Sequence, residues 1–215
     1  MLISLLVVLP FLAAGLFLAC NFLTNALAAF LSVNKPIANA QVLVVEGWLF
    51  TPMLHYVKEE FERGQYANIL VSGLPRDVVA GMSEPASDAA RTGRALVAMG
   101  VDSSKIVIVQ TNAGRVHKTF AMAQAARRWF ATHDSSVKRI NVCTVQGHGR
   151  KTWCAYRRVF AKTTQVGILS FPGRPLPVRA WWTTRRGIKW QLWFLAGYLD
   201  ARFWPIWLLP HKESP

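Results

Sequence analysis

The longest apolar run of the chain lies at its start. Residues 1–33 contain no charged side chain and are dominated by Leu, Ala, Phe and Val, and about 20 such residues suffice to cross a bilayer as a helix. A cleaved signal peptide would need a basic first region and a shorter apolar core. Phe17 to Cys20 resembles a lipoprotein cleavage box only loosely, because Leu18 is large for its position there. We therefore predict a transmembrane helix over residues 1–33.

From residue 34 to residue 171, short β-branched runs alternate with stretches whose apolar residues recur at helical spacing. The strands are predicted at residues 42–46, 69–72, 105–109, 140–145 and 166–171. The helices are predicted at residues 51–63, 83–99, 116–132 and 149–161. Strands alternating with helices of this length indicate a parallel sheet with right-handed crossovers. The expected fold of residues 34–171 is α/β, a Rossmann-like three-layer sandwich with about five parallel strands.

The pattern changes after Phe171. Three prolines between residues 172 and 177 indicate an extended linker, and the rest of the chain contains six tryptophans. Asp200 and Arg202 interrupt this apolar run, which makes it short for a second span. Tryptophan and arginine at the edge of an apolar helix suit the lipid headgroup layer. We interpret residues 172–215 as a Pro-rich linker and an amphipathic membrane-interface helix; packing against the first span or the α/β domain is the alternative.

The chain is strongly basic, with a formal net charge of +14 over 215 residues. No acidic residue lies between Asp134 and Asp200, a stretch that contains twelve lysines and arginines. A field of one sign this long favours a polyanionic partner, either anionic lipid headgroups, a phosphorylated substrate or nucleic acid. A solvated basic face is the alternative.

The three cysteines point to no metal site. Cys20 lies in the apolar leader, Cys143 in a predicted strand and Cys154 in a predicted helix, and no Cys/His spacing is typical of a metal centre. A Cys143–Cys154 disulfide is one reading of the pair. A cysteine in the middle of a strand is more often a small buried hydrophobic residue.

The most informative stretch runs from Ile140 to Phe160. It reads as a strand, a break at Gly147, His148 and Gly149, and then a helix with aromatic residues on one face. In open α/β sheets, ligands bind where the carboxyl ends of strands meet the amino ends of helices. A helix start attracts anions, and Arg150 and Lys151 add full positive charges. We therefore expect an anion site beside His148.

Other polar residues follow the remaining strands and should reach the same rim of the sheet. Glu46 ends an apolar strand, where burial would raise its pKa unless it is paired, so we expect a general acid or base; a salt bridge to Arg115 or Arg150 is the alternative. We expect His148 to act as a base or to donate a hydrogen bond to a phosphate; the alternative is that it is only a turn residue. The predicted catalytic residues are thus Glu46 and His148. The predicted substrate-binding residues are Gly47, Ser72, Gly73, Ser83, Glu84, Arg115, Thr119, Gly147, Arg150 and Lys151.

Several well-known motifs are missing from the sequence. There is no P-loop, and no G-x-G-x-x-G follows the first strand. Ser72 lacks the G-x-S-x-G frame of a nucleophile elbow, and Ser83 is first of all a helix cap. No metal and no cofactor is therefore predicted.

The order of motifs resembles the ElyC/SanA/YdcF family of bacterial envelope proteins. The matching pieces are VLVVEGW after the span, ILVSG, SEPASDAA, GRVHKTFAMA and QGHGRK, and they cover roughly residues 42–171. The tail resembles a branch of that family whose first loop reads Glu-Gly-Trp. The resemblance implies a Rossmann-like domain anchored by an N-terminal span and facing the periplasm, with a role in envelope or polysaccharide biogenesis and links to polyprenyl carrier lipids. The residues to which it assigns a role are Glu46, Ser72, Gly73, Ser83, Glu84, Thr119, His148 and Arg150.

The expectation for function is a single-pass protein of the bacterial inner membrane with its soluble domain in the periplasm. It would bind a phosphate-bearing, polyprenyl-linked saccharide beside anionic headgroups and hydrolyse or transfer it. A non-catalytic accessory factor that contacts a membrane-protein partner is the first alternative, and a nucleotide- or S-adenosylmethionine-binding module is the second. Nucleic acid is not expected as a partner, because no recognition motif accompanies the charge.

Overall fold

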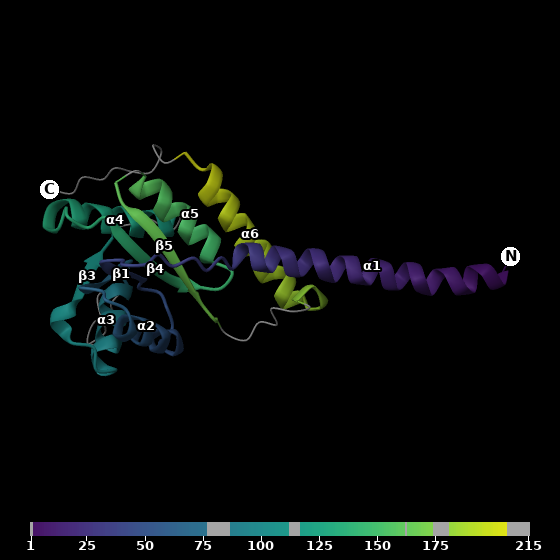
Figure 1. The fold of residues 1–215 in the computed structure, drawn as a ribbon, viewed down its shortest axis with the longest axis horizontal. Helices are drawn as coiled ribbons and strands as arrows, with labels where there is room; N and C mark the ends of the chain where they lie inside the picture. The colour runs from purple at the N-terminus through teal and green to yellow at the C-terminus, as the bar shows by residue number, and fades with distance from the viewer. Residues whose placement is uncertain (1, 77–86, 112–116, 162, 174–180, 206–215) are drawn as a thin grey trace.

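The computed structural model describes residues 2–76, 87–111, 117–161, 163–173 and 181–205, with the side chains of the first helix described from Pro10 onward. At its centre lies a sheet of five parallel strands in the order β3-β2-β1-β4-β5 (Figure 1). The strands are β1 (Val42–Glu46), β2 (Asn68–Gly73), β3 (Ile106–Gln110), β4 (Arg139–Val145) and β5 (Gln165–Phe171). The α/β fold predicted from the sequence is confirmed.

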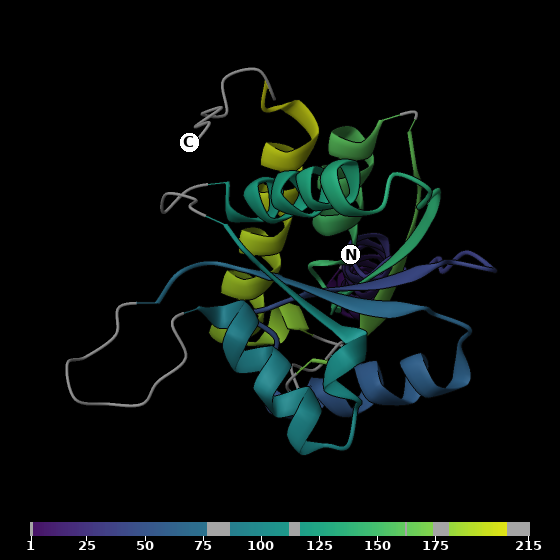
Figure 2. The ribbon, with the colours of Figure 1, turned by 90° about the vertical axis from the view of Figure 1, so that its left-hand side faces the viewer.

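Helices cover both faces of this sheet, which gives three layers (Figure 2). On one face lie α2 (Thr51–Arg63) and α3 (Asp88–Ala98), and on the other lie α4 (Lys118–His133) and α5 (Gly149–Phe160). Successive strand residues point to opposite faces. Val44 and Val142 therefore join the core under α4 and α5, while Val45 and Cys143 join the core under α2 and α3. Because both faces are buried, β1 is almost continuously apolar and every residue of β4 after Arg139 is buried.

The element boundaries differ from the predicted ones mostly by one or two residues, with one larger exception. Helix α3 begins at Asp88, and Ser87 caps it by accepting a hydrogen bond from the Ala90 N–H at 3.0 Å. The predicted start at Ser83 is therefore wrong. Ser87 fits the cap because its backbone is extended and its hydroxyl reaches an otherwise free N–H of the first turn.

Helix α1 (Leu2–Leu31) projects from the domain, as Figure 1 shows. Pro10–Leu31 is long and apolar enough to span a membrane by length and composition, and it is almost entirely unburied by the rest of the protein. The last turn does contact the domain, where Ala28 and Leu31 are buried. The last turn of α1 is thus a packed part of the domain.

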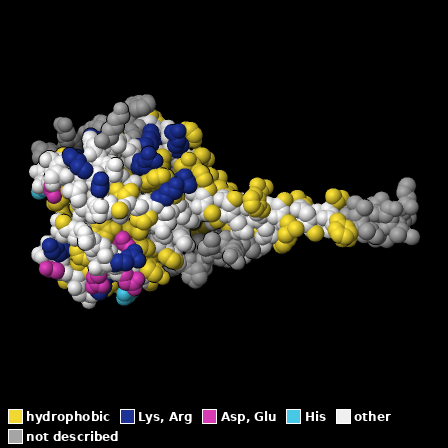
Figure 3. All heavy atoms as spheres, viewed as in Figure 1, with side chains coloured by type: hydrophobic (Ala, Val, Ile, Leu, Met, Phe, Trp, Pro, Cys, Tyr) yellow, Lys and Arg dark blue, Asp and Glu magenta, His cyan; other side chains and the backbone are white. Residues whose placement is uncertain are grey.

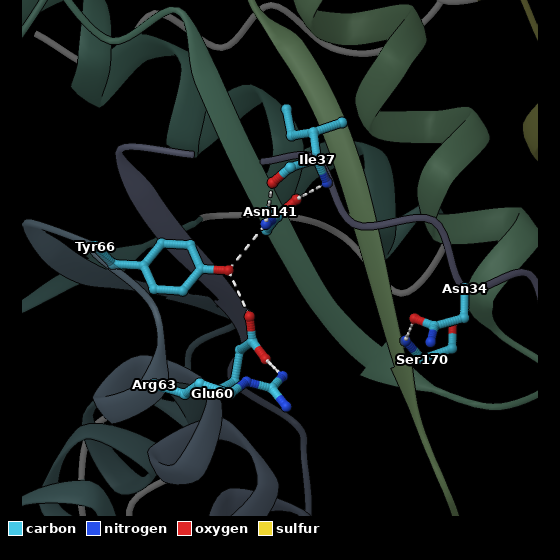
Figure 4. A network of polar contacts seen from close by, with 7 residues as sticks. All are labelled: Asn34, Ile37, Glu60, Arg63, Tyr66, Asn141 and Ser170. Carbon is cyan, nitrogen blue, oxygen red and sulfur yellow. Dashed lines mark hydrogen bonds and ion pairs between the residues drawn. The ribbon is translucent and has the colours of Figure 1, made fainter. Parts of the chain in front are cut away.

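The connector after α1 runs along the edge of the sheet. Lys35 and Ile168 exchange backbone hydrogen bonds of 2.8 and 3.0 Å, so the connector covers the edge strand β5. Beside it, the Asn141 side chain on β4 forms hydrogen bonds with the Ile37 backbone and the Tyr66 hydroxyl (Figure 4). The Asn34 side chain accepts a hydrogen bond from the Ser170 N–H. These bonds fix the direction in which α1 leaves the domain.

The tail forms a short 3-10 helix, η2 (Trp181–Thr183), and a long helix, α6 (Arg185–Phe203). Helix α6 packs against α5 and against the end of α1. The predicted linker at 174–180 and the end of the chain from 206 lie outside the described residues. In the part of the chain that is described, all three cysteines are free thiols, and Cys143 is the buried hydrophobic residue expected for the middle of a strand.

Charge is divided between the two sides of the domain in the view of Figure 3. Acidic side chains gather on the side of α2, while most lysines and arginines in view lie on the side of α4, α5 and α6. The segregation follows from the sequence, whose acid-free stretch forms β4, α5, β5 and most of α6.

Candidate functional site

Glu46 and His148 lie at the same edge of the sheet. Glu46 ends β1, and His148 follows the adjacent strand β4 and precedes the first residue of α5. Parallel neighbours bring their carboxyl ends together, so the two residues predicted to be catalytic are near each other. This edge is the candidate site.

The Glu46 carboxyl is fully buried. Its Oε2 accepts hydrogen bonds from the Thr144 hydroxyl at 2.6 Å and the Thr152 hydroxyl at 3.2 Å. Its Oε1 has no hydrogen-bond partner among the described residues. The Trp48 side chain is nevertheless close enough to lower the pKa of the carboxyl as a hydrogen-bond donor. Burial raises the pKa of Glu46, while the threonines and the charge of Lys151 act in the opposite direction. The expected rise of this pKa is present. Arg150 contacts Phe30 and not Glu46, and Arg115, the other alternative partner, lies outside the described residues.

His148 is buried among aromatic rings. Its ring centroid lies 5.0 Å from that of Trp48, 5.1 Å from that of Trp193 and 5.0 Å from that of Phe194. Burial, and secondarily the charge of Lys151, lower the pKa of His148 to about 3. The imidazole is therefore neutral at physiological pH, and it is a weak base there.

A cavity of about 840 Å³ lies in front of these residues, between the carboxyl edge of the sheet and α6. Most of its wall is apolar, with Trp48, Phe50, Met53, Met122 and Phe194 among the lining side chains. Four charged residues also line it. These are Asp88, Lys118, Lys151 and Arg186. An apolar pocket of this size with a few polar groups has the usual features of a small-molecule site.

Four of the predicted site residues line this cavity. They are Thr119, Gly147, His148 and Lys151. Gly147 adopts a positive φ of 83°, and a β-carbon there would lie 2.4 Å from the Phe194 ring. The glycine is thus needed for the close approach of α6, which forms one wall of the cavity. Glu46 does not line it, because its carboxyl is fully buried.

Three predicted residues have structural partners instead. A β-carbon on Gly47 or Gly73 would lie 2.8 or 2.4 Å from the Ala89 nitrogen, so these glycines let α3 approach the strand ends. The Ser72 hydroxyl is buried and donates to the Met122 carbonyl at 3.0 Å. The glycines at these two strand ends therefore leave room for the backbone of α3 at Ala89.

The amino end of α5 is also covered by the chain itself. A β-carbon on Gly149 would lie 2.7 Å from the Val33 carbonyl oxygen and 2.3 Å from the Ser170 hydroxyl. Arg150 turns toward α1, where it donates to the Phe30 carbonyl and its guanidinium lies 3.8 Å from the Phe30 ring centroid. The anion site expected at this helix start is therefore not formed by Arg150, whose charge instead caps the end of α1.

Ser83, Glu84 and Arg115 lie outside the described residues, and nothing is concluded about their positions. The structure adds residues that sequence reasoning missed, namely Trp48, Thr144, Thr152, Trp190 and Phe194. Trp48 follows directly after Glu46-Gly47, and a large aromatic residue in the loop at a strand end was a signal. The contribution of α6 had no local signal, because it depends on packing over 40 residues along the chain.

In comparisons with known proteins, no family model matches the chain and no curated protein gives a significant match. The geometry of the site therefore carries the functional argument.

Proposed function

We propose that the protein is a membrane-anchored factor of bacterial envelope or exopolysaccharide biogenesis, related to the ElyC/SanA/YdcF family, that binds an amphiphilic, phosphate-bearing substrate such as a polyprenyl-linked saccharide. The observation that carries this proposal is the cavity beside α1. It combines an aromatic and aliphatic wall with the cations Lys118, Lys151 and Arg186. An isoprenoid segment would contact the apolar wall, and its phosphate would contact the cations.

The anchor supports a substrate drawn from the membrane. The apolar helix α1 ends where the domain begins, and Ser32, the residue after its last turn, lines the cavity. A substrate held in the same bilayer as α1 has a raised effective concentration at the site. The compartment proposed for the domain is the periplasm.

Chemistry at this site would use Glu46 as a protonated acid and His148 as a neutral imidazole. Burial raises the pKa of Glu46, which favours its protonated form, and lowers the pKa of His148 to about 3. Hydrolysis or transfer at a phosphoester would require a local rearrangement that opens the buried Glu46 carboxyl to the cavity. The second candidate function, a non-catalytic accessory factor, is favoured by one observation: both Glu46 and the Ser72 hydroxyl are buried away from the cavity.

Binding is tested with the full-length protein in detergent, using farnesyl phosphate as a short polyprenyl phosphate. We expect it to quench the tryptophan fluorescence of the cavity and to raise the unfolding temperature. Farnesol should act more weakly, and inorganic phosphate should have no effect at the same concentration. Lys151→Gln should weaken binding of farnesyl phosphate but not of farnesol, while Lys105→Gln, outside the cavity, serves as the matched control. Equal binding of farnesyl phosphate by wild-type protein and Lys151→Gln would contradict the placing of the phosphate.

Catalysis is tested in the same system. If the protein is an enzyme, Glu46→Gln and His148→Phe should abolish turnover of a polyprenyl-linked saccharide while keeping its binding. If wild-type protein binds the substrate and no bond is broken, the accessory role holds.

A further inference from the structure

Helix α6 is apolar on two faces. Its inner face, with Trp190, Trp193 and Phe194, lines the cavity. Its outer face carries Ile188 and Leu192, whose side chains are 40% and 57% exposed. The first half of the helix also carries Arg185, Arg186 and Lys189, and exposed apolar side chains beside basic ones are typical of a helix that lies on a membrane surface. The described part of the chain covers only the inner face, so the outer face needs a partner.

The start of this tail lies against α1. The Trp181 indole N–H donates to the Thr24 carbonyl at 3.0 Å, and the Trp182 indole N–H donates to the Asn21 side-chain oxygen at 3.4 Å. The Trp182 ring also meets the Phe17 ring edge-on, with centroids 5.5 Å apart. In Figure 1, η2 and the first turns of α6 lie farther out along α1 than the rest of the domain. The outer face of α6 is thus continuous with the surface of the proposed span.

The polarity of α1 sets the level of the bilayer. Residues 2–20 contain no charged or amide side chain, whereas Asn21, Thr24 and Asn25 follow within two turns. A hydrocarbon core of about 30 Å takes about 20 helical residues, and counting back from Asn21 reaches the first turn of α1. If the core instead extended to Leu31, it would enclose the Arg150 guanidinium that contacts Phe30, at a cost of several kcal/mol. The hydrocarbon therefore ends near Asn21.

Charge at the start of α6 fits this level. Arg185, Arg186 and Lys189 are all exposed, and no acidic residue occurs from 181 to 199. Lysine and arginine near a bilayer surface are attracted to anionic lipids, and tryptophan prefers the headgroup layer.

We propose that residues 181–192, which comprise η2 and the first half of α6, lie in the headgroup layer of an anionic bilayer, at the level where α1 leaves the hydrocarbon. The outer face with Ile188 and Leu192 points into the membrane interface, and the basic side chains contact lipid phosphates. The cavity wall formed by Arg186 and Trp190 then lies at headgroup height. This inference depends on α1 crossing the bilayer and is independent of what the cavity binds.

The test uses the full chain in vesicles of phosphatidylcholine and phosphatidylglycerol, with part of the phosphatidylcholine brominated in the upper acyl chain. Cys20 and Cys154 are replaced by alanine, and Cys143 is kept because it is fully buried. A fluorophore sensitive to its surroundings is attached at Ile188→Cys. Ile108→Cys on β3 is the matched control, because Ile108 is 43% exposed and Ile188 is 40% exposed. Phe11→Cys, inside the proposed span, is the positive control.

We expect severalfold stronger bromolipid quenching at positions 188 and 11 than at position 108. Quenching at position 11 alone overturns the proposal and means that the outer face of α6 is open to solvent or covered by another protein. Absence of quenching at both positions overturns it as well, because α1 is then not in the bilayer.

The electrostatic part is tested separately. Replacing Arg185, Arg186 and Lys189 by glutamine should reduce the quenching at position 188, and so should omission of phosphatidylglycerol. The matched triple replacement of Lys105, Arg128 and Lys138 should leave it unchanged. If the first triple replacement has no effect, the contact with anionic headgroups is disproved.

Discussion

Two buried polar clusters lie at opposite ends of the strands, which we call the amino edge and the carboxyl edge of the sheet, and they are built differently. Toward the amino edge, the Asn141 side chain accepts from the Ile37 N–H at 2.9 Å and donates to the Ile37 carbonyl at 3.0 Å and the Tyr66 hydroxyl at 2.8 Å. The Tyr66 hydroxyl in turn donates to Glu60 at 2.7 Å, and Arg63 pairs with the same carboxylate (Figure 4). Nearly every hydrogen-bonding group of this cluster is satisfied.

At the carboxyl edge, the corresponding cluster is incomplete. One Glu46 oxygen accepts two hydroxyl hydrogen bonds while the other is buried without one. Burial raises the pKa of Glu46 and lowers that of His148, so it favours the neutral form of each group. Buried polar groups are normally paired, and those that are not tend to mark functional sites. The comparison indicates that the amino-edge cluster holds the fold together, whereas the carboxyl-edge cluster holds groups whose charge is suppressed beside a cavity.

The largest expected effect on stability is at Asn141. Asn141→Leu keeps the volume of the side chain but leaves the Ile37 N–H and carbonyl unpaired, and each unsatisfied buried group costs about 1–3 kcal/mol. We expect a loss of about 3 kcal/mol in the free energy of unfolding, measured by chemical denaturation in detergent. Tyr66→Phe removes a single hydrogen bond of the network and should cost about 1 kcal/mol. A neutral result for Asn141→Leu would mean that the amino-edge cluster does not hold the connector.

The next largest effect is the response of His148 to acid. Its pKa is about 3 in the folded protein and about 6.5 in the unfolded chain, so the unfolded state binds a proton first as the pH falls. The stability from His148 is complete above pH 6.5 and is lost between pH 6.5 and about 3. At pH 5 the loss should be about 2 kcal/mol, or about 4–8 °C in unfolding temperature.

The neighbours of His148 define the control for this measurement. Lys151 is the charged group that acts on its pKa, and Trp48, Trp193 and Phe194 surround the ring. His148→Phe keeps an aromatic ring and cannot take up a proton, so its unfolding temperature should fall less between pH 7.5 and pH 5 than that of the wild type. Parallel falls for the two proteins would show that His148 is not buried as described.

Glu46 should show the opposite dependence on pH. Because its pKa is raised in the folded state, the unfolded chain loses its proton first as the pH increases. Stability is therefore lost as the pH rises above about 4.5 toward the folded pKa. Glu46→Gln removes this loss, so we expect the variant to be more stable than wild type at pH 8 and no more stable at pH 4. A variant that is less stable at both pH values would place Glu46 among the structural groups.

The sequence predicted the sheet well because its signals are local. Five β-branched runs separated by helices of sufficient length allow little else than a parallel sheet, and the carboxyl-edge position of Glu46 and His148 follows from that topology. The rise of the Glu46 pKa was also predictable, since a carboxylate at the end of a buried strand is desolvated.

The rest of the site depends on contacts between distant segments. Val33 and Ser170 lie across the start of α5, and Phe30 attracts Arg150, so the expected anion site there is covered by the chain itself. The local sequence around QGHGRK does not predict where α1 and the connector after it lie, because these segments are far away along the chain. For the same reason, the cavity wall formed by α6 could not be placed from the tail alone.

The smallest effects should come from the two threonines that bind Glu46. Thr144 donates over 2.6 Å and Thr152 over 3.2 Å to the same oxygen, and replacement by the isosteric valine removes one hydroxyl in each case. A neutral hydrogen bond contributes about 0.5–1.5 kcal/mol, so we expect about 1 kcal/mol for Thr144→Val and about 0.5 kcal/mol for Thr152→Val. Double-mutant cycles with Glu46→Gln at pH 8 measure the coupling of each pair. If Thr152→Val costs as much as Asn141→Leu, the carboxyl-edge cluster supports the fold as much as the amino-edge cluster does, and the contrast between the two edges disappears. If its cost stays small, the carboxyl-edge cluster tolerates the loss of a hydrogen bond. That tolerance is expected of a carboxyl whose raised pKa favours the protonated form, the form that can donate a proton or a hydrogen bond.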